Sequence, residues 1–146
     1  MQNQSGTYSN QQQGGARIVG SQDTFDTAAG PGPNLMLADT LEGNDVVNPA
    51  GDDLGHIKGI MLDVQRGRIA YAVLSFGGFL GMGNKLFAIP WQALTLDTDE
   101  KQFVLNISED KLKNAPGFDK DHWPSMADPS WADEVHRYYQ TEPYWH

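Results

Sequence analysis

The stretch that decides the fold runs from Ile69 to Trp91 and reads I-A-Y-A-V-L-S-F-G-G-F-L-G-M-G-N-K-L-F-A-I-P-W. It holds two apolar runs, residues 69–76 and 85–89, with the length and the β-branched and aromatic composition of strands. Both faces of the first run are largely apolar, which predicts a central strand buried on two sides. Four glycines lie in the loop between the runs and favour a sharp turn there.

Further short strands are predicted on either side of this pair, separated by turn signals. They cover residues 41–47, 54–62, 94–96 and 102–107. Two glycines inside the second of them, Gly55 and Gly59, predict a bulge or a bend. Five or six strands with short connections favour an all-β fold, a closed or nearly closed barrel of SH3-like size over residues 35–108.

Two segments of different composition flank this region. Residues 1–34 are rich in Gln, Asn, Gly and Ser and hold few apolar side chains, which predicts a disordered polar tail. Residues 109–146 carry helical signals. Ser108 can cap one short helix, and Ser130 begins an S-W-A-D run of capping-box form that predicts a second helix. We expect this helical and irregular extension to pack on the barrel.

Composition narrows the function classes. The chain has 146 residues and no cysteine, so disulfide and thiol chemistry are excluded. The polar N-terminus lacks the apolar core of a signal peptide, and no apolar run has the length of a membrane helix, so we expect a cytoplasmic protein without membrane insertion. Acids outnumber bases by 19 to 10, for a net charge of −9, which opposes binding to nucleic-acid phosphates.

Two runs carry a family resemblance: G-D-D-L-G-H-I-K-G-I-M-L-D from Gly51, and G-R-I-A-Y-A-V through A-I-P-W from Gly67. Together they resemble the PRC-barrel domain family, over about residues 38–108. That family includes the cytoplasmic domain of the photosynthetic reaction-centre H subunit and the C-terminal domain of a ribosome maturation factor. The tail, with F-D-K-D-H-W-P and Y-Y-Q-T-E-P-Y-W, looks like that of free-standing bacterial members. The resemblance implies a small β-barrel that docks to other proteins, without a catalytic motif or a cofactor.

Candidate contact residues come from the glycine loop and from the tail. Phe79, Leu80 and Met82 lie among glycines and predict an apolar knob that anchors a protein partner. Seven aromatic residues crowd the tail, where they either complete the core or face outward; Trp123 and Trp145 are our candidate contacts. The histidines lack metal-ligand spacing, and no catalytic constellation stands out, so neither a metal site nor an enzyme is predicted.

The leading hypothesis is therefore a non-catalytic protein-interaction module that also self-associates, with a dimer favoured because exposed apolar surface on a small protein is usually covered. One alternative is a small-ligand site between barrel and tail, lined by Tyr71, Trp91 and Trp131. Another, by analogy with the ribosome maturation factor, is a role in ribonucleoprotein assembly.

Overall fold

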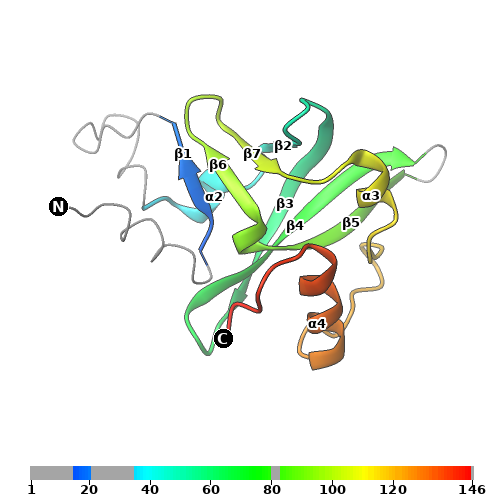
Figure 1. Ribbon diagram of the computed structural model, residues 1–146. Coiled ribbons are helices and arrows are strands. Elements are labelled where there is room, and N and C mark those ends of the chain that lie inside the picture. Colours follow the sequence, from blue (N-terminus) through cyan, green and yellow to red (C-terminus); the bar gives the residue numbers. More distant parts are fainter. Residues whose placement is uncertain (1–14, 21–34, 80–82, 146) are drawn as a thin grey trace.

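A computed structural model describes residues 15–20, 35–79 and 83–145 of the chain (Figure 1). Seven strands and four helical segments occur in it. The strands are β1 (Arg17–Val19), β2 (Asp45–Val47), β3 (Asp53–Asp63), β4 (Arg68–Phe79), β5 (Gly83–Pro90), β6 (Leu94–Asp97) and β7 (Gln102–Leu105). The helical segments are α2 (Ala38–Leu41), the 3₁₀ turn η1 (Trp91–Ala93), α3 (Glu109–Lys113) and α4 (Pro129–Tyr138).

The strands form one mixed sheet in the order β1-β6-β7-β2-β3-β4-β5. Strand β1 runs parallel to β6 and β2 runs parallel to β7, whereas the other neighbours are antiparallel. The predicted closed barrel is not found: in the described ranges the outer strands β1 and β5 do not pair with each other. The outer edge of β5 is instead occupied by the C-terminal extension, because Leu86 and Phe118 exchange two backbone hydrogen bonds of 2.9 and 2.8 Å.

Strand β4 behaves as its sequence predicts. Every residue from Ala70 to Phe76 is buried, so both faces of the strand are covered. Its partner β3 changes register between Ile57 and Gly59, which is the irregularity that the glycines predict. The hairpin of β6 and β7 and the end of β5 at Pro90 are confirmed as well.

Two predicted boundaries differ from the structure. Only residues 45–47 of the first predicted strand are extended; Leu41 ends α2, and Gly43 turns the chain with φ of 86°. In the N-terminal range 1–34, which was predicted to be disordered throughout, residues 17–19 form β1 beside β6. The division of the chain at residues 34 and 108 stays a prediction.

The helices of the extension begin at side-chain caps. The Ser108 side chain accepts a hydrogen bond from the Lys111 amide, so the predicted cap of α3 is confirmed. Helix α4 begins two residues earlier than predicted, because Asp128 and not Ser130 is its cap: the Asp128 carboxylate accepts the Ser130 amide at 3.0 Å. Pro129 fits the first helical position, since no amide donor is needed there.

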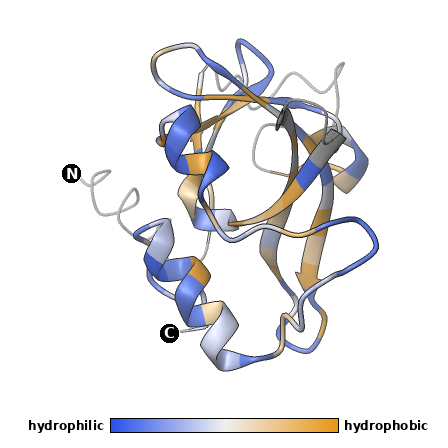
Figure 2. Cartoon of the chain, turned by 90° about the vertical axis from the view of Figure 1, so that its right-hand side faces the viewer, coloured by the Kyte–Doolittle hydropathy of each residue, from blue (hydrophilic) through white to orange (hydrophobic). Residues whose placement is uncertain are grey.

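The core consists of two clusters of buried side chains that share β4. The larger cluster joins residues from β2 to β7 and α3, with Phe87, Phe103 and Leu112 among its fully buried members. The smaller cluster contains Ala70, Tyr71, Ala88 and Val135, and it is where α4 meets the sheet. Figure 2 shows hydrophobic residues concentrated on the strands and hydrophilic residues on α4 and the connecting loops.

Candidate functional site

Tyr71 of β4 lies at the centre of an aromatic cluster beneath the C-terminal extension. Its ring meets those of Trp131, His136 and Tyr144 edge to face, with centroids 5.4, 5.6 and 6.3 Å away. Trp145 continues the cluster, 5.3 Å from His136 and 5.0 Å from Tyr144. Aromatic pairs of this geometry add stability beyond their buried area. They hold α4 and the last residues against the sheet.

Polar contacts tie the same segment to the hairpin between β3 and β4. The Tyr144 hydroxyl donates to Asp63 Oδ2 at 2.5 Å, and Arg68 Nη1 donates to the Tyr144 carbonyl oxygen at 2.8 Å. Gln92 Nε2 also donates to the Glu142 carbonyl oxygen. Figure 1 shows the C-terminus beside this end of the β3–β4 hairpin. The extension is therefore fixed to the sheet on both its apolar and its polar side.

The Asp63 carboxylate accepts hydrogen bonds from both sides of this junction. The hydrogen bond from the Tyr144 hydroxyl, with those from the Arg66 amide and guanidinium, lowers the pKa of Asp63 to about 2. Burial and the bond to Asp63 raise the pKa of Tyr144 to about 12. Burial, with smaller effects of Tyr144 and Asp133, raises the pKa of Tyr71. At neutral pH the carboxylate is ionised and both hydroxyls keep their protons, so they serve binding better than proton transfer.

A groove of about 510 Å³ opens between the hairpin and the extension. We call it the hairpin groove. Most of its lining residues are apolar; the polar ones are Tyr71, Tyr144 and the pair of Asp63 and Arg66, whose side chains form an ion pair of 2.9 Å. The lining residues are Met61, Leu62, Asp63, Val64, Arg66, Ala70, Tyr71, Met126, Ala127, Pro129, Ala132, Tyr144 and Trp145.

Two lining residues stand out by their exposure. Leu62 is 60% exposed and Val64 is 87% exposed, although both are large apolar side chains. They lie on either side of Asp63 where β3 ends. At the base of the groove, Tyr71 is only 3% exposed, and its hydroxyl has no hydrogen-bond partner among the described residues.

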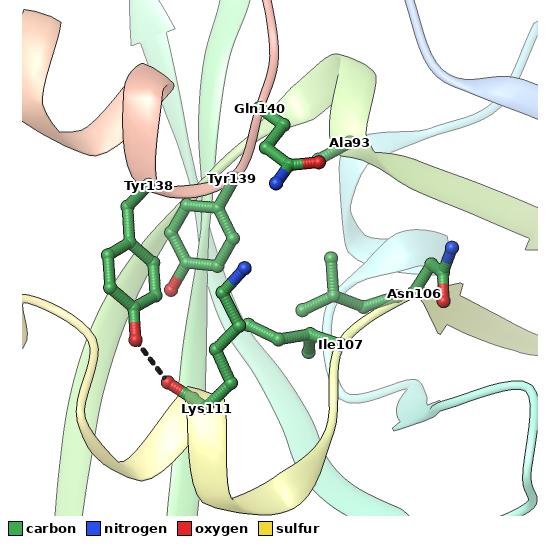
Figure 3. Close-up of a pocket in the computed structure, with 8 residues that line it drawn as sticks. Ala93, Asn106, Ile107, Lys111, Tyr138, Tyr139 and Gln140 are labelled. Carbon is green, nitrogen blue, oxygen red and sulfur yellow. Dashed lines mark hydrogen bonds between the residues drawn. The ribbon is translucent and has the colours of Figure 1, made fainter.

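A second, smaller pocket of about 240 Å³ lies between α3 and the end of α4 (Figure 3). Lys111 and Gln140 extend toward the same space, and the Tyr138 hydroxyl donates to the Lys111 carbonyl oxygen at 2.6 Å. The Lys111 ammonium lies 5.6 Å from the centre of the Tyr138 ring. These contacts join the two helices, and we assign the pocket a structural role.

The structure brings together only some of the residues singled out in the sequence. Tyr71 and Trp131 are in contact, but Trp91 packs on Phe103, 5.8 Å away, against the larger core cluster. The three therefore do not line one site, because η1 turns Trp91 toward the other cluster. Trp145 lines the hairpin groove, whereas Trp123 does not.

Trp123 has local partners instead. It is 46% exposed, its ring packs at a tilt against that of Phe118 with centroids 4.8 Å apart, and its indole N–H donates to the Lys120 carbonyl oxygen. Leu80, Met82 and the side chain of Phe79 lie outside the described residues, so the apolar knob stays a prediction.

Sequence reasoning missed the hairpin groove itself. Met61, Leu62 and Val64 stand next to a polar turn, and Met126 stands in a stretch without regular periodicity. A signal was present: an apolar residue on each side of Asp63, at the very end of a predicted strand, places bulky side chains where little of the fold can cover them.

In residues 15–20, 35–79 and 83–145, no three His, Asp or Glu side chains come together as metal ligands. In the same ranges, no helix combines the length and the apolar character needed to span a bilayer.

The PRC-barrel domain family matches residues 33–112, which is more than half of the chain. The chain belongs to this family. PRC-barrel domains are generally non-catalytic binding modules.

Among solved structures, the PRC-barrel chain is similar to a protein of Pseudomonas aeruginosa described as the 16S ribosomal RNA processing protein RimM. The identity is 16%, the TM-score is 0.36, and the match covers 51% of this chain and 45% of that one. The chain thus spans less than half the length of that protein. None of the curated proteins matches the sequence.

Proposed function

We propose that this PRC-barrel chain is a non-catalytic protein-interaction module and that it docks a partner in the hairpin groove. The observation that carries the proposal is the exposure of Leu62 and Val64 at the lip of an apolar groove. Large apolar side chains so placed are typical of protein-binding surfaces.

The groove has the dimensions of a docking site. Its volume of about 510 Å³ lies in the range of natural binding pockets and suits one or two large side chains. Covering an exposed Leu or Val fully contributes roughly 1.5–3 kcal/mol. Met61 and Met126 in the lining are flexible and polarisable, so they can adapt to an inserted side chain.

The rigidity of the walls favours the same function. Asp63, Tyr144 and Arg68 fix the extension to the hairpin, and the aromatic cluster supports it from below. A groove that is preformed loses little conformational entropy when a partner binds.

The apolar knob of Phe79, Leu80 and Met82 is a second contact in this proposal, and it rests on the sequence alone. We assign self-association to the knob, with a dimer as the expected state. Sedimentation at high micromolar concentration tests it: the wild type sediments as a dimer and Leu80→Ser as a monomer. A wild-type monomer under these conditions contradicts self-association.

Site-specific photo-crosslinking in the native cells tests docking at the groove. A crosslinking amino acid at Val64 captures a discrete partner, and Leu62→Ser in the same chain abolishes that product. The control places the crosslinker at Leu37, which precedes α2, is 67% exposed and does not line the groove. Equal products from both positions, or a product that survives Leu62→Ser, contradict the assignment.

A small apolar ligand in the groove is the second candidate function. It is favoured by the Tyr71 hydroxyl, which is buried and without a partner in the described part of the chain. Native mass spectrometry of the purified protein decides this alternative, because a resident ligand adds a defined mass that Tyr71→Phe reduces.

A further inference from the structure

One acidic segment of the chain, residues 119–134, contributes Met126, Ala127, Pro129 and Ala132 to the lining of the hairpin groove. Residues 119–134 carry five carboxylates and one lysine, a net charge of −4 out of −9 for the whole chain. All five are exposed. They are Asp119, Asp121, Asp128, Asp133 and Glu134.

Two of these carboxylates are chain neighbours of residues that line the groove, and we take these two as its acidic rim. Asp128 lies between Ala127 and Pro129, and Asp133 follows Ala132; all three of these neighbours line the groove. Asp128 uses one oxygen to cap α4. Asp133 has no hydrogen bond or ion pair with any described residue, and its charge contributes to the raised pKa of Tyr71 at the base of the groove.

The opposite wall carries no comparable excess of charge. Asp63 accepts hydrogen bonds from the Arg66 amide, the Arg66 guanidinium and the Tyr144 hydroxyl, so the Asp63–Arg66 pair is neutral as a unit. Arg68 donates to the Tyr144 carbonyl oxygen. On the side of the extension, Asp128 and Asp133 form no ion pair with any described residue.

We infer that the occupant of the hairpin groove is a basic, apolar peptide segment of a different protein: a large apolar side chain enters between Leu62 and Met126, and a flanking Lys or Arg reaches Asp128 and Asp133. This inference rests on the proposed docking function and adds the chemistry of the partner. Complementary charges of this kind speed association and exclude wrong partners.

The same charge argues against other occupants. Nucleic acid and anionic lipid surfaces bind through Lys and Arg clusters, and this rim is acidic. At this acidic rim a second copy of the chain, with its own net charge of −9, is repelled, which agrees with assigning self-association to the knob and not to the groove. A separate protein with exposed basic residues meets neither obstacle.

Fluorescence anisotropy with two labelled peptides tests the inference. One short peptide is built of leucine and lysine, and the other has glutamate in place of every lysine. The full chain binds the lysine peptide, more weakly as salt rises, and does not bind the glutamate peptide. Asp128→Asn with Asp133→Asn weakens binding by about three- to tenfold, as expected for two exposed ion pairs. Asn preserves the cap of α4.

A charge-matched control separates a specific contact from general attraction. Glu42→Gln with Glu100→Gln removes the same charge from exposed positions outside residues 119–134, and it leaves the affinity for the lysine peptide unchanged. An equal loss in both double variants overturns the inference.

The inference and the docking function fail in different ways. Equal binding of both peptides, weakened by Leu62→Ser, overturns the basic chemistry and leaves docking at the groove intact. If neither Leu62→Ser nor Val64→Ser changes the affinity for the lysine peptide, both the inference and the docking function are overturned.

Discussion

Replacing Gly55 by alanine should lower the stability of the protein strongly, because it disturbs the pairing of β3 with β4. Gly55 has φ of 111°, and an added Cβ would lie 2.1 Å from the carbonyl oxygen of Ser75, where real contacts stay above 3.0 Å. The backbone must move by about 1 Å, and Ser75 is held in register with both His56 and Leu86. Gly59 in the same strand is the natural control, because a Cβ there meets no heavy atom within 4 Å.

The expected cost follows from these distances. A non-glycine residue in a sparsely populated backbone region costs about 1–3 kcal/mol, and one or two lost ladder hydrogen bonds add about 1 kcal/mol each. The sum of about 2–5 kcal/mol is a large part of a typical domain stability of about 5–15 kcal/mol. It lowers Tm by about 8–20 °C for a chain of this size.

Gly59→Ala should change the free energy of unfolding by less than about 1 kcal/mol, in the stabilising direction, because alanine restricts the unfolded chain. Thermal and urea unfolding followed by circular dichroism measure both variants. Equal Tm values for Gly55→Ala and Gly59→Ala would refute the close approach of β3 and β4 on which this reasoning depends.

Three further predictions concern the site. Tyr71→Phe raises the free energy of unfolding by about 1 kcal/mol, since it removes a buried hydroxyl without a described partner. If urea titration instead shows a lower free energy of unfolding for the variant, the hydroxyl makes a hydrogen bond and the reasoning is wrong. The pKa of Asp63 is lowered from 3.8 to about 2 on folding, so its stabilisation is complete above pH 4 and is lost as the pH falls toward 2; the stability difference between wild type and Asp63→Asn should shrink over that interval, and a constant difference contradicts the assignment. Tyr144→Phe raises the pKa of Asp63 in carboxylate NMR titrations, because the Tyr144 hydrogen bond is the largest cause of the lowering; an unchanged pKa refutes that bond.

The sequence predicted those features best that depend on one short segment of the chain. The apolar alternation of residues 69–76 was enough to predict a strand covered on both faces, and Ser108 was enough to predict a helix start. Gly55 and Gly59 indicated the register shift of β3 for a local reason too, since a glycine in a strand marks a backbone that must bend.

The features that were missed depend on segments far apart in the chain. Closure of the barrel was expected from the number of strands, yet Phe118 occupies the outer edge of β5, and no strand pattern announces that pairing. Strand β1 was missed because three residues in a polar tail carry no periodicity. Trp91 was grouped with Tyr71 and Trp131 by residue type, but the turn η1 directs it to a different cluster.

In the candidate site, too, local features were predicted and features that depend on distant segments were missed. Aromatic crowding in the tail left open whether these rings complete the core or face outward, and in the structure Trp131 and Tyr144 lie against Tyr71 of β4. The hairpin groove exists only because the extension returns to the β3–β4 hairpin. The contact between Tyr144 and Asp63 joins residues that are 81 positions apart in the sequence.

Methionine methyl NMR tests the docking groove most directly. With ¹³C-methyl methionine, Met61 and Met126 report from inside the groove, and Met36 reports from the larger core cluster away from it. Single Met→Leu variants assign the signals. On addition of the leucine–lysine peptide, the account predicts that the signals of Met61 and Met126 shift while that of Met36 does not. Unchanged Met61 and Met126 signals with a bound peptide, or a shift of Met36 alone, would contradict it.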